Sequence, residues 1–369
     1  MRIKHARRLS RRLAGAAIAV LAVFTLVTAE GEAAASPVSC RPVRLEADYL
    51  VPVGRTVGIK IRSGGVIITA LSTVETTDGT ACPAKEAGLQ PGDIITRIDG
   101  AAVKTAEALV SAVNRRSGAV ELTVQRGEKT VQCRLTPAKD RSGGQRKIGA
   151  FVRDSLAGIG TITFYDPQSG VFGALGHGIS ESETGMRMPL ETGTLISSTI
   201  TGVRRGKRGE PGELVGCFDL AKDAGQLYSN LDTGLFGMLS RRELYPELLS
   251  AEPVPVGHEG DVRPGRAEIL ANVSGTAVQR YEIEIVRVLS TERETKNLYL
   301  RVTDPALLAA TGGIVQGMSG SPILQDGKLI GAVTHVLVSD PAYGYGILID
   351  HMLHTAGAEA QPDAAARVR

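Results

Sequence analysis

Glycine is the residue that most limits what this chain can fold into. The sequence of 369 residues contains 44 glycines, only 4% aromatic residues and no tryptophan. Glycine permits tight turns and close backbone approaches and weakens helix interiors, so this composition favours many short β-strands over long helices. The length suits two globular domains and an N-terminal appendage. We therefore expect a mainly β protein with more than one hydrophobic core.

The first 36 residues are typical of an export signal. Basic residues precede an apolar run from Leu13 to Ala29, and the small residues Ala33–Ser36 follow. This order is that of a secretory signal peptide, but the apolar run is also almost long enough to span a bilayer as an anchor helix. Cleavage after Ala35 and retention in the inner membrane both remain open. The basic flank predicts that the chain after about residue 30 is exported across the cytoplasmic membrane.

Charge and cysteine spacing limit the partners and cofactors. The net charge is +3, and much of the excess lies in the N-terminal cluster, so no nucleic acid partner is predicted. A second basic run, at 204–208, is expected to be a solvated loop. No C-x-x-C or metal-ligand spacing occurs, so we expect no metal and no organic cofactor. The chain has four cysteines, Cys40, Cys82, Cys133 and Cys217. Export permits disulfides, and the pair to test is Cys82 with Cys133. Free thiols are the alternative.

Residues 37–48 are predicted to be a tether, and residues 49–138 to form a compact α+β unit. Strands are expected at 59–61, 65–68 and 72–74, a helical turn at 83–89, a helix at 106–114 and a hairpin at 119–128. The run from Ala84 to Gly100, A-x-x-A-G-L-x-x-G-D-I-I-x-x-I-D-G, resembles the PDZ domains of exported bacterial proteases. This resemblance implies a peptide that adds to a sheet edge, with its carboxylate in a loop matched by Val57, Gly58 and Ile59. The ligand can be a free C-terminus, an internal segment or the protein's own chain, and a purely structural role is the alternative.

A polar linker at 142–145 precedes a second unit, expected at 145–356. Short strands with frequent turns favour a barrel or a sandwich over parallel βαβ units. These strands are expected at 158–165, 170–175, 196–203, 214–218, 267–273, 280–288 and 298–302. The alanine-rich, charged tail at 357–369 is expected to be disordered.

Two glycine-flanked residues carry the candidate chemistry of the second unit. Ser319 lies in Gly-Met-Ser-Gly-Ser-Pro, where glycines allow the tight turn that exposes a nucleophilic hydroxyl. His177 ends an apolar run between two glycines, which leaves room for a serine hydroxyl to reach its ring. A simple glycine-serine turn and a structural histidine are the alternatives. The remaining histidines give weaker signals; His335, for example, ends the strand that would support the serine turn.

Spacing alone does not select the acid that would orient His177. Four aspartates are expected near strand ends: Asp166, Asp219, Asp232 and Asp304. Asp304 precedes Pro305 and a short helical segment, so a helix N-cap is an equally good interpretation of that residue.

Two further resemblances concern the second unit. The serine motif is similar to the nucleophile turn of chymotrypsin-like proteases, which implies a double β-barrel and an oxyanion hole made by the backbone N–H groups of Gly317 and Ser319. Met318 replaces the aspartate by which digestive enzymes of that type bind a new N-terminus, so that form of activation is not expected. From about residue 45 to residue 355, the order of motifs resembles the stage IV sporulation protein B family of endospore-forming bacteria.

The family resemblance implies a serine endopeptidase (EC 3.4.21) with His177 as base, Asp304 as orienting acid and Ser319 as nucleophile. It also implies export into the intermembrane space around the forespore and cleavage of the extracytoplasmic part of a membrane-bound regulator. An intramembrane protease then releases the late sigma factor, sigma-K. Self-cleavage near residues 37–50 is implied as well. The alternative is a PDZ-based scaffold with a degenerate protease-like domain, which the retained serine and histidine disfavour. A PDZ domain acting as an autoinhibitory clamp also remains open.

Overall fold

The computed structural model describes residues 47–239, 251–289 and 295–358. The expected export segment at 1–36, most of the tether, Cys40 and nearly all of the expected tail lie outside these residues. Within the described part, no helix has both the length and the apolar character that crossing a membrane requires. The three described cysteines, Cys82, Cys133 and Cys217, are free thiols.

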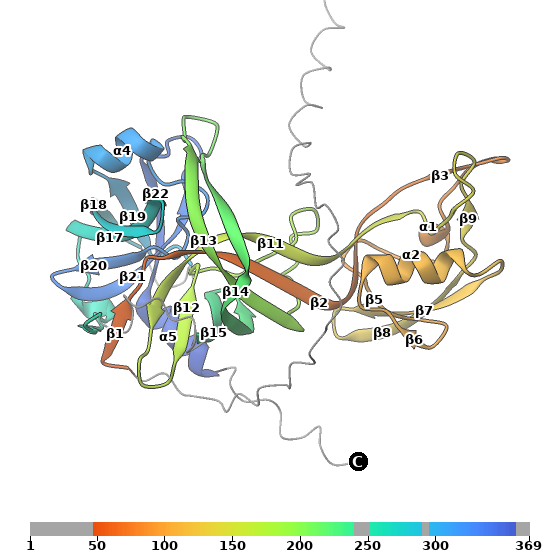
Figure 1. Cartoon of the computed structure of the whole chain (residues 1–369), viewed down its shortest axis with the longest axis horizontal. Coiled ribbons are helices and arrows are strands. Elements are labelled where there is room, and N and C mark those ends of the chain that lie inside the picture. Colours follow the sequence, from red (N-terminus) through yellow and green to blue (C-terminus); the bar gives the residue numbers. More distant parts are fainter. Residues whose placement is uncertain (1–46, 240–250, 290–294, 359–369) are drawn as a thin grey trace, which may run out of the picture. The chain divides into compact units, whose positions relative to one another are not determined.

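Six antiparallel strands close a first barrel, because each strand pairs with the next and the last returns to the first. On β2 the side chains of Ile59 and Ile61 are buried while those of Lys60 and Arg62 are exposed, the period of two that a half-buried strand requires. The short strand β1 (Tyr49–Pro52) extends this barrel through β11 and also pairs with β16 (Val254–Pro255). The six strands, drawn in Figure 1, are β2 (Thr56–Leu71), β11 (Ala150–Tyr165), β12 (Val171–Ala174), β13 (Thr192–Arg204), β14 (Glu213–Leu231) and β15 (Gly234–Leu239).

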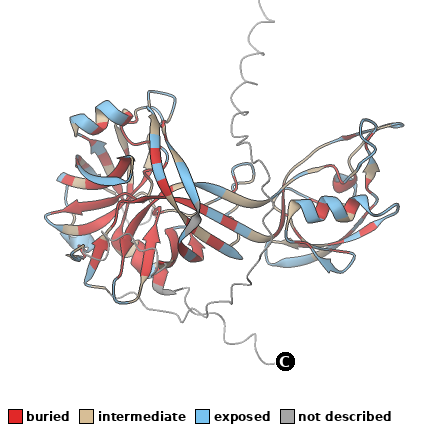
Figure 2. Cartoon of the chain, in the orientation of Figure 1, coloured by how far each residue is buried: buried red, intermediate tan, exposed pale blue. Residues whose placement is uncertain are grey.

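A second closed barrel follows in the chain, with strand order β17-β18-β19-β22-β21-β20. Its interior is mostly aliphatic and includes Met318, which is only 1% exposed. Figure 2 shows buried segments along the strands of both barrels. The strands are β17 (Gly265–Ser274), β18 (Ala277–Val288), β19 (Leu298–Val302), β20 (Pro322–Gln325), β21 (Lys328–Val336) and β22 (Tyr343–Leu348).

The PDZ unit is an insertion in the first barrel rather than a domain that precedes it. Within β2, Val57, Ile59 and Ile61 belong to the core of the first barrel, whereas Val66 and Ile68 belong to the core of the insertion. The chain returns through β11, whose first residues pack on the same inserted core. The inserted unit therefore begins within β2 and not at the expected residue 49, because this one strand contributes side chains to two cores.

The inserted unit has its own sheet in the order β2-β5-β7-β8. Thr105 caps helix α2, since its side chain accepts a hydrogen bond from the N–H of Ala108. The elements of this unit are β3 (Val74–Thr76), β4 (Gly79–Ala81), α1 (Pro83–Glu86), β5 (Ile94–Ile98), β6 (Ala101–Ala102), α2 (Ala106–Asn114), β7 (Val120–Arg126), β8 (Lys129–Leu135), β9 (Ala138–Lys139) and β10 (Arg146–Lys147).

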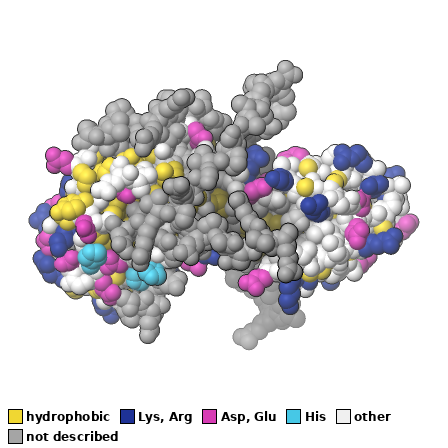
Figure 3. All heavy atoms as spheres, turned by 90° about the horizontal axis from the view of Figure 1, so that it is seen from below, with side chains coloured by type: hydrophobic (Ala, Val, Ile, Leu, Met, Phe, Trp, Pro, Cys, Tyr) yellow, Lys and Arg dark blue, Asp and Glu magenta, His cyan; other side chains and the backbone are white. Residues whose placement is uncertain are grey.

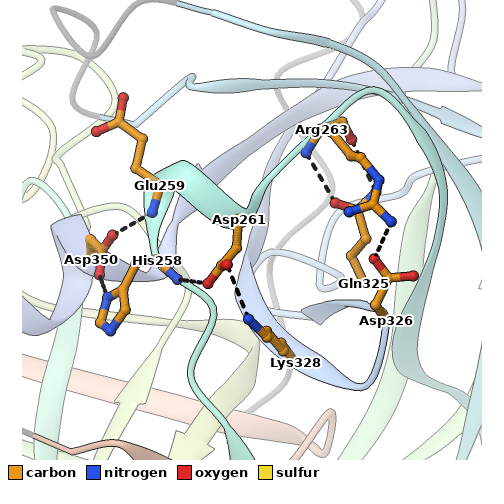
Figure 4. A network of polar contacts seen from close by, with 8 residues as sticks. All are labelled: His258, Glu259, Asp261, Arg263, Gln325, Asp326, Lys328 and Asp350. Carbon is orange, nitrogen blue, oxygen red and sulfur yellow. Dashed lines mark hydrogen bonds and ion pairs between the residues drawn. The ribbon is translucent and has the colours of Figure 1, made fainter.

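In the part of the chain that the structure describes, three short helical elements accompany the second barrel: η1 (Glu259–Asp261), α4 (Pro305–Thr311) and α5 (Ile349–Ala358). Figure 4 shows how η1 is fixed to its neighbours by polar contacts. His258 Nδ1 lies 2.8 Å from Asp350 of α5, and Lys328 of β21 lies 3.0 Å from Asp261. These contacts connect η1 to α5 and to the β20–β21 hairpin.

Acidic residues accompany the basic run expected to be a solvated loop. Arg204 pairs with Glu213 at 3.0 Å and Lys207 with Glu210 at 3.1 Å. On the face drawn in Figure 3, basic and acidic side chains lie near one another in several places on the described surface. Charge is therefore balanced over short distances on this surface.

Candidate active site

The turn that carries Ser319 is fixed by its own backbone and by glycine. Met318 N–H donates to Val315 O at 3.1 Å, and Ser321 N–H donates to Met318 O at 2.9 Å. Gly320 adopts φ +95°, and a Cβ added there would lie 2.0 Å from Thr161 O and 2.6 Å from Leu175 N. No other residue fits this position, because the conformation is left-handed and the neighbours are backbone atoms.

Thr161 of β11 links the first barrel to this turn. Its N–H donates to Ser319 O at 2.9 Å, and its hydroxyl donates to Gly317 O at 2.7 Å. Its own carbonyl accepts a hydrogen bond from Leu175 N–H at 3.2 Å, at the end of β12. One residue thus holds both the serine turn and the strand end that leads to His177. Its role cannot be predicted from the sequence, because a threonine within an apolar strand carries no local signal.

Two backbone N–H groups of the turn are candidates for an oxyanion hole. Gly317 has φ +99° and lies in the buried part of the turn. In the part of the chain that the structure describes, neither Gly317 N–H nor Ser319 N–H donates a hydrogen bond. Unpaired donors beside a nucleophile can stabilise the oxyanion of a tetrahedral intermediate, as the sequence motif predicts for these two residues.

His177 follows β12 after two residues in left-handed conformation, Leu175 (φ +68°) and Gly176 (φ +70°). A left-handed non-glycine residue is uncommon and costs conformational energy. The His177 Nδ1 atom lies 2.9 Å from Gly178 O. If that nitrogen carries the proton, Nε2 is left with the free lone pair that a general base needs. The following loop is held by Asn230, whose amide contacts Ile179 and Met188.

The structure brings His177 and Ser319 to the same junction through β21. The Ser319 hydroxyl donates to Thr334 O at 2.8 Å, and the next residue, His335, places its ring centroid 5.2 Å from that of His177. Among the described residues, Ser319 and His177 are not hydrogen-bonded to each other. The nucleophile and the base are therefore adjacent but not engaged in this state, which is common before substrate binds.

Burial sets the protonation of both histidines. It lowers the pKa of His177, against the opposing effect of the Gly178 carbonyl. Burial, followed by the charges of His177 and Lys296, lowers the pKa of His335 to about 4. Both rings are thus held neutral at pH 7, which is the state in which His177 can accept a proton.

The structure does not bring Asp304 to His177. Asp304 is the N-cap of α4, and one of its carboxylate oxygens accepts from Ala306 N–H and Leu307 N–H at 2.8 and 3.0 Å. The other accepts from Glu282 N–H at 3.3 Å. Figure 1 shows α4 at the upper margin of the second barrel, away from β12. The capping interpretation therefore applies, because N–H groups at the start of α4 and in the middle of β18 already donate to this carboxylate.

The other aspartates considered have their own partners. Asp166 accepts hydrogen bonds from Gln168 and Ser169 in its own turn, and Asp219 also has an interaction of its own. Asp232 is bonded to the residue after His177, because its main-chain carbonyl accepts a hydrogen bond from Gly178 N–H at 3.2 Å. Its carboxylate, however, is 67% exposed and pairs with Arg187 at 3.1 Å. No described aspartate hydrogen-bonds His177.

A cavity of about 240 Å³ borders this junction. Ile159, which adjoins Gly317, forms part of its wall, as do Leu175 and Ile179 on either side of His177. Arg153 lies at the same cavity and faces the buried Glu181 at 3.9 Å. Its position and mixed lining suit a substrate side chain. In the described residues, no group of three potential metal-ligating side chains occurs.

The predicted carboxylate loop of the PDZ unit does not lie where the sequence analysis placed it. Val57, Gly58 and Ile59 pair with β11 on one side and with β13 on the other. Their backbone groups are therefore used in the barrel sheet and cannot receive a peptide. A second run, at 148–150, has the same apolar–glycine–apolar pattern, so the pattern alone does not select one of the two.

That second run begins a strand with an open edge. Arg146 N–H donates to Asn114 at the end of α2, and Asp154 accepts from Ala106 N–H at its start, so the chain between them runs beside the helix. Within the described residues, Ala150 to Arg153 pair only with β2. Gly149 has φ +79°, and a Cβ there would lie 2.8 Å from Ser72 O. An unpaired strand edge beside a helix suits β-strand addition of a peptide.

Two antiparallel barrels, a serine turn with open N–H donors and a neutral histidine beside it define a serine peptidase with an inserted PDZ domain. The model of the family "SpoIVB peptidase S55" matches residues 144–353, and that of the PDZ domain matches residues 79–126. The chain belongs to the SpoIVB peptidase S55 family.

Solved structures of both domain types are similar to parts of the chain. The PDZ domain of the SdrC-like protein Lmo2051 from Listeria monocytogenes is 24% identical over 24% of this chain and 87% of that one, with a TM-score of 0.20. The inactive form of the Rv3671c protease is 12% identical over 56% and 85%, with a TM-score of 0.30. Human heparin binding protein is 13% identical over 54% and 84%, with a TM-score of 0.28. The family assignment rests on the two family models.

Proposed function

We propose that this peptidase is an exported regulatory endopeptidase in which Ser319 is the nucleophile and His177 is the general base. The observation that carries this proposal is the junction itself. Thr161 holds the serine turn and the end of β12 together, and open N–H donors flank the nucleophile. After Ser319 Oγ rotates from Thr334 O to His177 Nε2, its proton passes to the ring as the hydroxyl attacks, and the ring returns it to the leaving amine.

The substrate we propose is the extracytoplasmic part of a membrane-bound regulator, whose cleavage triggers intramembrane proteolysis and sigma-K activation during sporulation. Membership of the SpoIVB peptidase S55 family supports this role. The basic and apolar N-terminal sequence supports export or anchoring at the membrane facing the forespore intermembrane space. We also propose self-cleavage within residues 37–50, which connect that segment to the strands of the first barrel in the sequence.

We further propose that the PDZ domain binds a peptide segment, from the substrate or from the protein's own chain, along the open edge of β11. The peptide would extend the sheet opposite β2 and lie beside α2, with the turn at 147–150 at one end. The unpaired edge supports this site, and its main-chain hydrogen bonds would supply affinity with little sequence preference.

The test compares the full-length chain with Ser319→Ala and Ser321→Ala. We expect Ser319→Ala to lose at least about 10³-fold in both self-cleavage and cutting of a regulator fragment. Ser321→Ala is the matched control, because its buried hydroxyl has no hydrogen-bond partner among the described residues and should keep activity. Cutting that persists in Ser319→Ala would refute this assignment. Cutting of the tether but not of any regulator fragment would refute the proposed substrate alone.

A further inference from the structure

Strand β11 changes its partners where it reaches the catalytic junction. Over residues 162–165 it pairs with β12, and Leu175 N–H then donates to Thr161 O. The chain of β12 ends there and leads into His177. Within the described residues, the main chain of 150–160 pairs only with β2. The edge of β11 that β12 covers is therefore unpaired along the rest of the strand, and the unpaired part begins beside the base.

The cavity of about 240 Å³ lies along this unpaired edge. Gly158 of β11 lines it and is exposed, and a Cβ added to that glycine would meet no atom within 4 Å. Space for a side chain is thus present beside the strand, but β11 itself provides none to fill it. Most of the wall is aliphatic and comes from β2, from β11 and from both sides of His177: Ile59, Leu156, Ile159, Leu175 and Ile179.

The charges at the cavity are matched to each other. Arg153 lines it, and its guanidinium lies 3.9 Å from the carboxylate of Glu181. Glu181 is fully buried, and one of its oxygens accepts from two N–H groups of its own turn. A charged side chain that entered the cavity would lose water without meeting an unmatched opposite charge. The cavity therefore suits an uncharged, aliphatic side chain.

The position of the base decides which part of a substrate lies along this edge. The ring that takes the proton of Ser319 gives it to the leaving amine, so the substrate chain after the scissile bond begins beside His177. From there, the unpaired main chain of β11 offers hydrogen-bond donors and acceptors to an added strand. A chain that continues the course of β12 along this edge runs antiparallel to β11 and passes the cavity.

We propose that the substrate chain after the scissile bond adds to β11 as an antiparallel strand over residues 155–160, and that the cavity binds an aliphatic side chain from one of its first two residues. The main-chain hydrogen bonds supply affinity, and the cavity supplies selectivity. The same edge continues to Ala150, so a long substrate reaches the open edge beside α2 on the same strand. This inference rests on the proposed roles of Ser319 and His177 and names the substrate class that they act on.

The test changes the size of the cavity in the full-length chain and sequences the new N-termini that each variant produces from a peptide library. Gly158→Leu fills the cavity, Gly158→Ala fills part of it, and Leu156→Ala enlarges it. We expect the wild-type protein to prefer Val, Ile or Leu at the first or second position after the cut. Gly158→Leu should abolish that preference and lower kcat/KM on such peptides at least about tenfold. Gly158→Ala should have a smaller effect, and Leu156→Ala should shift the preference to Phe and Met.

Two controls separate this site from the catalytic groups and from general damage. A fluorophosphonate that labels Ser319 expels fluoride and places no peptide on the leaving side, so the labelling rate of every cavity variant should stay within about twofold of wild type. Gly202→Leu is the matched control, because Gly202 of β13 also has open space around an added Cβ but does not line the cavity. It should keep the wild-type preference and kcat/KM.

A second measurement tests the added strand. Two peptides of the preferred sequence end one and six residues after the cut, and the longer one should have at least about tenfold higher kcat/KM, because only its chain can pair along β11. Equal values for the two peptides overturn the strand addition.

The cavity assignment is overturned if the wild-type protein has no aliphatic preference after the cut, or if labelled Gly158→Leu keeps it. If Gly158→Leu is not labelled, unchanged preferences in Gly158→Ala and Leu156→Ala overturn it. Ser319→Ala in the same series separates the two levels of inference. Cutting that persists in Ser319→Ala refutes the catalytic assignment. Cutting that is lost there, with an unchanged preference in the cavity variants, refutes only this subsite.

Discussion

At the scale of single residues, the reactive groups are present but bonded to the backbone. Ser319 Oγ donates to Thr334 O, and His177 Nδ1 contacts Gly178 O. Two main-chain carbonyls thus hold the nucleophile and the base in separate positions. Engagement needs a side-chain rotation at each residue rather than a rearrangement of the barrels. Such rotations are small in energy, so bound substrate can drive them.

The first prediction concerns the pH dependence of cleavage. Burial lowers the pKa of His177, and a lowered pKa keeps the ring unprotonated to a lower pH. The acid limb of kcat/KM should therefore lie below the ordinary histidine value of about 6.5. Measuring kcat/KM from pH 4.5 to 9 checks this, with circular dichroism at each pH as the control for folding. An acid limb at about pH 7 or above would contradict it.

Functional residues could be predicted from the sequence only where their immediate neighbours mark them. Ser319 and His177 were selected because glycines beside them mark unusual backbone, and the structure places both at one junction. Thr161 acts through contacts with residues distant in the chain, and nothing adjacent to it in the sequence indicates those contacts. Asp304 illustrates the opposite case, because a strand-end aspartate before proline has the same local pattern as a helix cap and as a catalytic acid.

At the scale of elements, α4 shows how a short helix uses its cap. The helix spans only seven residues, Pro305–Thr311, and ends at Gly312 in the left-handed conformation. The Asp304 carboxylate satisfies two of its initial N–H groups and also accepts from Glu282 N–H. A helix this short has little stability of its own, so the cap and the buried Leu307 hold it on the barrel.

The second prediction tests whether Asp304 acts through this cap. Asp304→Ala should cost about 1 kcal/mol of unfolding free energy, because two N–H groups lose their acceptor. Asp304→Asn should recover most of that loss, and kcat should stay within about twofold in both variants. Chemical denaturation and turnover measured on the same preparations check this. If folded Asp304→Asn instead loses about 10⁴-fold in kcat, as removal of an orienting carboxylate can do, the carboxylate acts on His177 in a state other than this one.

At the scale of the molecule, the PDZ unit is built into the peptidase through two of its strands. β2 and β11 are paired over most of their length, from Leu71 with Ala150 to Thr56 with Thr161. One end of this ribbon carries the open edge beside α2, and the other end carries Thr161, which holds the nucleophile turn. The Ala84–Gly100 run predicts the domain but not its boundary, because a strand shared by two cores contains no turn that marks the change from one to the other.

The last prediction separates the two units along that ribbon. Arg62 pairs with Ser155, so residues 63–154 can be replaced by a two-residue Asn-Gly turn that joins the two strands as a hairpin. We expect this variant to keep the first barrel, fold cooperatively and react with a fluorophosphonate at Ser319. Deletion of 49–137 is the contrasting control: it removes all of β1 and β2. This variant should not fold, because Val57, Ile59 and Ile61 are fully buried or nearly so in the barrel core. Faster cutting by the hairpin variant would identify the PDZ domain as a clamp, whereas loss of cutting with retained labelling would identify it as a recruiter of substrate. An unfolded hairpin variant, or a folded 49–137 deletion, would contradict the assignment of these strands to the peptidase barrel.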